Sequence, residues 1–121
     1  MDTRYVPERN DIVWLDFEPT KGKEIGKSRP ALVLSGQAYN RATGLLICCP
    51  VSTSIRGAAT EVAVGVLDQP GVVAANLVMT LGWTQRKARK ETEAELGVMD
   101  AVLLRLLPLI GAERFFACGA P

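Results

Sequence analysis

The chain has 121 residues, with 14 basic and 13 acidic side chains and no histidine. This length predicts one small domain spanning residues 1–121, of which 112–121 form a short C-terminal tail. The lack of histidine excludes imidazole acid–base catalysis, Ser-His or Cys-His nucleophile pairs and imidazole metal ligands within one chain. A net charge of +1 excludes a strongly basic nucleic-acid coat but allows a local basic patch.

The three cysteines, Cys48, Cys49 and Cys118, form an odd set without CxxC spacing. The first residues contain no apolar export segment, and no apolar run approaches the roughly 18 residues of a membrane span. These features predict a reduced, cytoplasmic protein. Cys48 and Cys49 are adjacent in a predicted strand and are expected to pack on opposite faces rather than to bind a metal together. We expect no metal and no cofactor.

Several short runs of apolar and β-branched residues, bounded by turn-forming residues, predict strands. They are DIVWLDF (11–17), a run opened by Pro30 (30–35), LLICCPV (45–51) and EVAVGV (61–66). Residues 72–83 predict a strand pair or one long bent strand, with Gly82 as a candidate bulge. Polar loops are expected at 20–29 and 52–60, and the connection 35–44 has room for one helical turn.

The C-terminal part predicts an amphipathic helix over residues 93–110. Thr92 and Glu95 fit a capping box, Pro108 should bend or end the helix, and Gly111 fits a helix stop. The apolar positions recur at three- and four-residue steps: Leu96, Met99, Leu103, Leu106, Leu107 and Ile110. Short strands followed by one helix predict a small, mostly antiparallel α+β barrel with the helix packed on its side.

Charged and hydroxyl side chains cluster in three segments next to the predicted strands. The first holds Lys21, Lys23, Glu24, Lys27 and Arg29; the second holds Ser52, Thr53, Ser54 and Arg56; the third holds Arg86, Lys87, Arg89 and Lys90. Brought together, these groups would attract a phosphate chain, with Glu91, Glu93, Glu95 and Asp100 balancing the charge elsewhere. The alternative is that the lysines are ordinary solvated loop charges.

Arg29 is the most specific of these residues, because its rigid guanidinium suits a phosphate with charge developing on its oxygens. The alternative for Arg29 is a salt bridge to Glu24 or Asp16. Ser52 and Thr53 offer hydroxyl groups to a phosphate, or form a local turn.

Trp14 and Phe17 are expected on opposite faces of the first strand. Phe17 is assigned to the core. Trp14 and Trp83 remain divided between the core and a surface on which a base could stack.

The segments RYVP, DIVWLDF followed by PTKG, RPALVLS, PVST and GW with basic residues closely resemble the MazF/PemK family of toxin endoribonucleases, over roughly residues 4–110. The resemblance implies an SH3-like barrel with a C-terminal helix, a homodimer, and metal-independent, sequence-specific cleavage of single-stranded RNA. It implies catalytic roles for Arg29 and for a hydroxyl at Ser52 or Thr53, with Glu24 as a candidate base or positioning group. It also implies a cognate MazE-like antitoxin.

The expected mechanism is attack by the RNA 2'-hydroxyl on the adjacent phosphorus, which gives 2',3'-cyclic phosphate and 5'-hydroxyl ends. The side chains expected to bind RNA are Lys21, Lys23, Lys27, Trp14, Arg56 and Arg86. Two alternatives remain: a non-catalytic barrel that binds nucleic acid or peptide, and an inactive regulatory family member. Ser52 in place of the family's usual threonine, and Leu77 in place of its usual glutamine, favour the inactive member.

Overall fold

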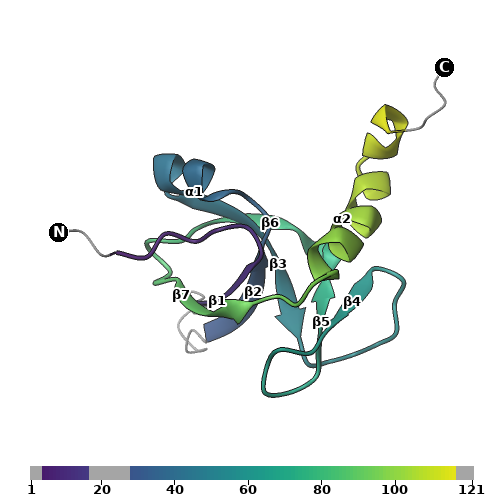
Figure 1. The fold of residues 1–121 in the computed structure, drawn as a ribbon, viewed down its shortest axis with the longest axis horizontal. Coiled ribbons are helices and arrows are strands. Elements are labelled where there is room, and N and C mark those ends of the chain that lie inside the picture. Colours follow the sequence, from purple (N-terminus) through teal and green to yellow (C-terminus); the bar gives the residue numbers. More distant parts are fainter. Residues whose placement is uncertain (1–3, 17–27, 117–121) are drawn as a thin grey trace, which may run out of the picture.

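The computed structural model describes residues 4–16 and 28–116 (Figure 1). Its elements are β1 Asp11–Asp16, β2 Ser28–Val33, α1 Gln37–Thr43, β3 Leu45–Ser52, β4 Glu61–Val64, β5 Gly71–Ala74, η1 Ala75–Leu77, β6 Met79–Gly82, β7 Arg89–Glu93, α2 Val98–Leu109 and η2 Ala112–Phe115. No helix in the described part of the chain is long and apolar enough to cross a membrane.

The strands form one curled antiparallel sheet in the order β4-β5-β3-β2-β1-β7, with β6 paired to β3. Figure 1 shows the sheet as a half-barrel with α2 beside β4 and β5. The long strand β3 joins the two halves, because it pairs with β6 along its first part and with β5 at its end. The predicted antiparallel barrel with a C-terminal helix is confirmed.

Alternation along the central strands fills two separate cores. Cys49 packs with β4, β5 and α2, whereas Cys48 packs with Trp83 and the other face of β1 and β2. Both thiols are fully buried and unpaired. The expected placement of Cys48 and Cys49 on opposite faces is therefore confirmed.

Several predicted strand limits differ from the structure. β2 begins at Ser28, two residues before Pro30, so Arg29 belongs to a strand rather than to the loop before it. β4 ends at Val64, and Val66 is exposed. The bulge predicted at Gly82 is wrong, since Gly82 pairs in regular register with Leu45.

The strand β7 was not predicted, because its sequence RKETE has neither apolar residues nor alternation. It forms because its backbone pairs with the buried strand β1 along the open edge of the sheet. Backbone pairing at an edge does not depend on apolar side chains.

Helix α2 begins five residues later than predicted. Thr92 lies in β7, the residue before the helix is Gly97 at φ 95°, and Leu96 is fully exposed, so the capping box is wrong. The buried face consists of Val98, Val102 and Leu106. Pro108 lies in the last turn, where the helix stops, and the predicted stop at Gly111 is confirmed by its left-handed φ of 77°.

The start of the C-terminal tail is a single 3-10 turn, η2. The two aromatic residues of the tail, Phe115 and Phe116, are largely exposed, so neither joins the described cores. Residues 117–121 lie outside the described part of the chain.

Candidate functional site

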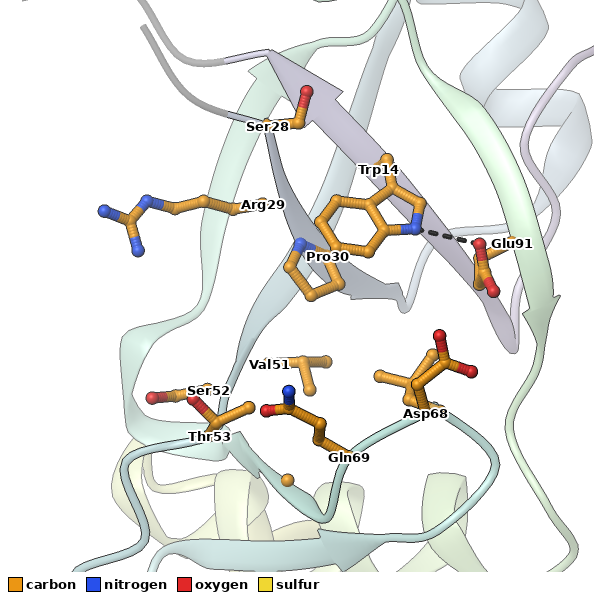
Figure 2. Close-up of a pocket in the computed structure, with 12 residues that line it drawn as sticks. Trp14, Ser28, Arg29, Pro30, Val51, Ser52, Thr53, Asp68, Gln69 and Glu91 are labelled. Carbon is orange, nitrogen blue, oxygen red and sulfur yellow. Dashed lines mark hydrogen bonds between the residues drawn. The ribbon is translucent and has the colours of Figure 1, made fainter. Parts of the chain in front are cut away.

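A cleft of about 380 Å³ opens where β1 and β2 separate from the end of β3 (Figure 2). Strands β1 and β2 supply one side, the end of β3 supplies a second, and the connection between β4 and β5 supplies a third. The described residues that line it are Trp14, Ser28, Arg29, Pro30, Val51, Ser52, Thr53, Leu67, Asp68, Gln69, Gly71 and Glu91.

Arg29 and Ser52 lie on the same face of the sheet. The last residue pair between β2 and β3 is Ala31 with Pro50, and continuing this antiparallel register places Arg29 opposite Ser52. Opposed residues of an antiparallel pair point to the same face. Figure 2 shows both side chains on one side of the cleft, with Arg29 extending away from Trp14. The two groups therefore border the same part of the cleft from two rigid strands.

The hydroxyl of Ser52 takes part in a local turn and is still able to donate. Its Oγ accepts a hydrogen bond from the Ser54 backbone N–H at 2.9 Å. A hydroxyl has one proton to donate in addition to its acceptor sites, so this bond leaves the Ser52 proton available. Thr53, the next residue, follows the strand and is exposed. The turn and the hydroxyl function proposed for this segment are thus compatible.

The predicted alternative in which Asp16 pairs with Arg29 is wrong. Asp16 instead accepts a hydrogen bond from the Ser28 hydroxyl at 2.8 Å and forms a salt bridge with Arg89 at 3.1 Å. These two partners, Ser28 first, hold the pKa of Asp16 below its usual range. Arg29 is exposed and forms no ion pair with any carboxylate in residues 4–16 and 28–116. Its guanidinium is thus free of the described carboxylates and extends into the solvent at the border of the cleft, away from Trp14.

Trp14 is half-buried and crosses the cleft from β1. Its indole Nε1–H donates to Glu91 Oε1 at 3.0 Å, which fixes the orientation of the ring. Trp83, by contrast, is buried and donates to the Asn40 carbonyl at 2.8 Å. Trp14 is therefore a cleft residue, and Trp83 is a core residue.

The sequence did not indicate that three polar residues, Asp68, Gln69 and Glu91, line the cleft. Glu91 was expected to balance charge away from the site; that expectation is wrong, because β7 pairs beside β1 and brings Glu91 to Trp14. Asp68 and Gln69 lie in a turn-rich connection whose sequence carries no distinguishing signal. Only the pairing of distant strands brings them to the site.

Some of the predicted basic residues lie away from the cleft. Arg56 and Arg86 do not line it; the Arg86 guanidinium donates to the Asp16 carbonyl at 3.4 Å. Lys90 forms salt bridges with Glu93 and Asp11, which raise its pKa. The predicted site residues Lys21, Lys23, Glu24 and Lys27, together with Phe17, lie outside the described residues. Within the described ranges no three Asp, Glu or Cys side chains group as metal ligands.

Comparisons with known proteins agree with this fold. The family model described as PemK-like, MazF-like toxin of type II toxin-antitoxin system matches residues 8–110. The endoribonuclease toxin MazF of Escherichia coli K12 is 37% identical over 111 residues, covering 92% of this chain and 100% of the relative. The endoribonuclease toxin ChpB of the same strain is 34% identical, covering 85% and 93%.

The agreement extends to three-dimensional structure. A crystal structure of MazE-MazF from Deinococcus radiodurans superimposes with a TM-score of 0.85 at 42% identity, covering 89% of this chain and 98% of the other. A structure of MazF from the same organism has a TM-score of 0.79 at 42% identity, covering 89% and 99%. The chain therefore belongs to the family of PemK-like, MazF-like toxins of type II toxin-antitoxin systems.

Proposed function

We propose that this protein is an endoribonuclease toxin that cleaves single-stranded RNA at specific sequences and is silenced by a cognate antitoxin. The observation that carries the proposal is the placement of Arg29 and Ser52 on one face at an open cleft, in a chain whose relatives are named endoribonuclease toxins. A guanidinium and a hydroxyl on adjacent strands are suited to holding the two sides of one phosphodiester.

The proposed reaction is an internal transesterification of the RNA. The 2'-oxygen forms a bond to phosphorus while the bond from phosphorus to the 5'-oxygen breaks, which leaves a 2',3'-cyclic phosphate and a 5'-hydroxyl. Arg29 stabilises the negative charge that develops on the phosphoryl oxygens, and the Ser52 hydroxyl, which keeps its proton, donates a hydrogen bond to the phosphate or to the departing oxygen. Thr53 remains the second candidate for that hydroxyl.

The proton of the attacking 2'-hydroxyl needs an acceptor other than histidine, which the chain lacks. Arginine is a poor base because its pKa exceeds about 12. We assign this role, or the positioning of the nucleophile, to Glu24, whose carboxylate is the nearest in sequence to Arg29 in the charged loop. The proton released is returned to the departing 5'-oxygen, so the reaction consumes none.

We assign RNA binding outside the reacting phosphate to a set of basic and aromatic side chains. They are Lys21, Lys23, Lys27, Arg56, Arg86 and Trp14. The cations neutralise the RNA backbone, and the Trp14 ring offers a stacking surface. This division follows the usual one in which charge gives affinity and the cleft gives selectivity.

The proposed assembly is a homodimer that acts in the cytoplasm and binds a MazE-like antitoxin. Solved relatives include MazE-MazF complexes, one at a TM-score of 0.85. An acidic, partly disordered antitoxin segment laid across the basic side chains would exclude RNA by occupying its path. The buried free thiols Cys48 and Cys49 fit a reducing compartment.

The test is to incubate the purified protein and its Arg29→Ala variant with a long single-stranded RNA in excess EDTA, and to map the new ends. Discrete cuts with 2',3'-cyclic phosphate ends, absent in the variant, are expected. A substrate with deoxyribose at the cut position should resist cleavage, because it lacks the nucleophile. Binding of RNA without cleavage at high protein concentration would favour the non-catalytic barrel module instead.

A further inference from the structure

We propose that Glu91 and Asp68 form a base-selecting subsite in the cleft, which accepts a nucleobase bearing an exocyclic amino group and rejects uracil. This inference rests on the proposed function, because it specifies which RNA that function selects. Figure 2 shows the two carboxylates together on one side of the cleft, with Arg29 and Ser52 on the other. One side of the cleft therefore carries a guanidinium and a hydroxyl group, and the other side carries two carboxylates.

The position of Glu91 comes from a break in the pairing of β1 with β7. Ile12 pairs with Thr92 and Val13 pairs with Lys90, so Glu91 is the extra residue between two consecutive partners. An extra residue of this kind is a β-bulge, which bends the strand and changes the direction of a side chain, and such bulges are common beside functional sites. Here the bulge residue is the one that lines the cleft and contacts Trp14.

The two carboxylates retain free acceptor capacity. Glu91 Oε1 accepts from the Trp14 indole, and no other hydrogen bond or ion pair joins Glu91 to the described residues. Asp68 forms no hydrogen bond or ion pair within the described part of the chain. Both side chains are exposed to the cleft. An ionised carboxylate is an acceptor only, so this side of the cleft needs donors from its ligand.

Negative charge beside an RNA site is unfavourable unless the RNA supplies a donor there. Adenine and cytosine each present an exocyclic amino group, and guanine presents an amino group next to a ring N–H. Uracil presents two carbonyl oxygens on either side of its single N–H, and a carbonyl oxygen facing a carboxylate oxygen is repulsive. A single-stranded base stacked on Trp14 has its hydrogen-bonding edge free to reach these carboxylates.

The experiment measures binding to a randomised pool of 2'-fluoro RNA, which cannot be cleaved by 2'-hydroxyl attack. Sequencing of the bound fraction should show uracil depleted by about tenfold at one position, in line with roughly 1–3 kcal/mol for a charge-assisted base contact. In Glu91→Gln and Asp68→Asn the depletion should fall below about threefold. The side-chain amide oxygen introduced by Glu91→Gln can still accept from the Trp14 indole, so the ring keeps its orientation.

The matched control is Glu113→Gln, which removes a carboxylate that does not line the cleft. It lowers the negative charge equally and should leave the uracil depletion unchanged. A second measurement replaces the selected base by its analogue without the amino group: purine riboside for adenosine, inosine for guanosine, or 2-pyrimidinone riboside for cytidine. Wild-type binding should weaken by about tenfold, and the two cleft variants should not respond.

Uracil depletion that is absent in the wild type, or equal in the wild type and both cleft variants, overturns the subsite. Cleavage of ordinary RNA by the same preparations is measured in parallel, so the proposed function is judged separately. Cleavage without amino-group discrimination overturns the subsite alone. Discrimination without cleavage supports the subsite and overturns the nuclease.

Discussion

Arg29 and Ser52 occupy opposed positions two residues beyond the last pair of β2 and β3, on the face that also carries Ala31 and Pro50. Beyond this point β3 pairs with β5 instead of β2, so the cleft opens where the two strands diverge, with both side chains on the same side of it. Each residue is held by a strand whose inner part is largely buried. The backbone of the pair is thus fixed relative to the protein core before any ligand binds, which favours stabilisation of a charged transition state.

Replacing Arg29 by Ala should reduce the rate of RNA cleavage by at least about a hundredfold, since loss of one donor to a developing oxyanion typically has that effect. The fold should remain, because Arg29 is exposed and forms no ion pair with the described carboxylates. Initial cleavage rates measure the loss of activity, and thermal melting followed by circular dichroism checks that the fold remains. Arg29→Lys keeps the charge without the planar donor pair and should recover only part of the rate. Unfolding of the Ala variant would instead indicate a structural role.

The hydroxyl at position 52 should matter more than the hydroxyl at position 53. Ser52 is opposite Arg29, whereas Thr53 is past the end of the strand, so Ser52→Ala should lower the cleavage rate by about tenfold or more and Thr53→Ala by less than about threefold. Ser52→Thr keeps the hydroxyl and should retain activity. Equal losses in the two Ala variants would contradict the assignment to Ser52.

Most of the sheet was predictable because its strands, apart from β7, are short runs of apolar and β-branched residues, and side chains alternate between the two faces within each run. Cys48 and Cys49 illustrate this: alternation alone places one sulfur in each core, as the structure confirms. The sequence predicts that a helix is present in this part of the chain, but it does not predict the residue at which α2 begins. Leu96 fits a three- to four-residue period, yet Gly97 in a left-handed conformation separates it from the helix and leaves it in solvent. Periodicity does not reveal such a local reversal.

The site was predictable only in part, since a charged strand gives no strand signal. Arg29, Ser52 and Trp14 stand in or next to apolar strands, so the sequence alone makes them candidates, and all three line the cleft. Glu91 could not, because the RKETE segment becomes a strand only by pairing with β1, which is far away in sequence. Its place beside Trp14 depends further on a one-residue bulge, which is a property of the pairing and not of the local sequence.

Trp14→Ala should weaken the binding of non-cleavable single-stranded RNA by about tenfold, since stacking of a base on an aromatic side chain contributes roughly 1–3 kcal/mol. Trp14→Phe keeps a ring but loses the hydrogen bond to Glu91, so it should bind with an intermediate affinity. Fluorescence anisotropy of a labelled oligonucleotide measures all three proteins. Unchanged affinity in the Ala variant would show that the RNA does not use this ring.

Two leucines of α2 provide a matched test of its packing. Leu106 is buried against the core that contains Cys49, whereas Leu104 is 70% exposed. Leu106→Ala should therefore lower the free energy of unfolding by about 2–4 kcal/mol, and Leu104→Ala by less than about 0.5 kcal/mol. Urea denaturation measures both. A similar loss in the two variants would mean that Leu104 is covered in the protein as it exists in solution.

The stability of the protein should fall as the pH rises above about 8 because of its two buried thiols. Burial raises the pKa of Cys48 to about 12, with the neighbouring Cys49 adding to the shift, and raises that of Cys49 to about 11. An exposed thiol in the unfolded chain has a pKa of about 8.5. Above that pH the unfolded state releases protons that the folded state keeps, so the free energy of unfolding decreases as pH rises, by up to about 1.4 kcal/mol per pH unit for each thiol.

The decrease is measured by urea denaturation at several pH values, in a Cys118→Ser background that removes the third thiol. Cys49→Ala should halve the slope, because only Cys48 then ionises differently in the two states. Restricting the range to about pH 9.5 and below limits the contributions of Tyr5 and Lys90, whose pKa values are also raised in the folded protein. An unchanged slope in Cys49→Ala would show that this thiol ionises in the folded protein as readily as in the unfolded chain, and so that the core around it admits water.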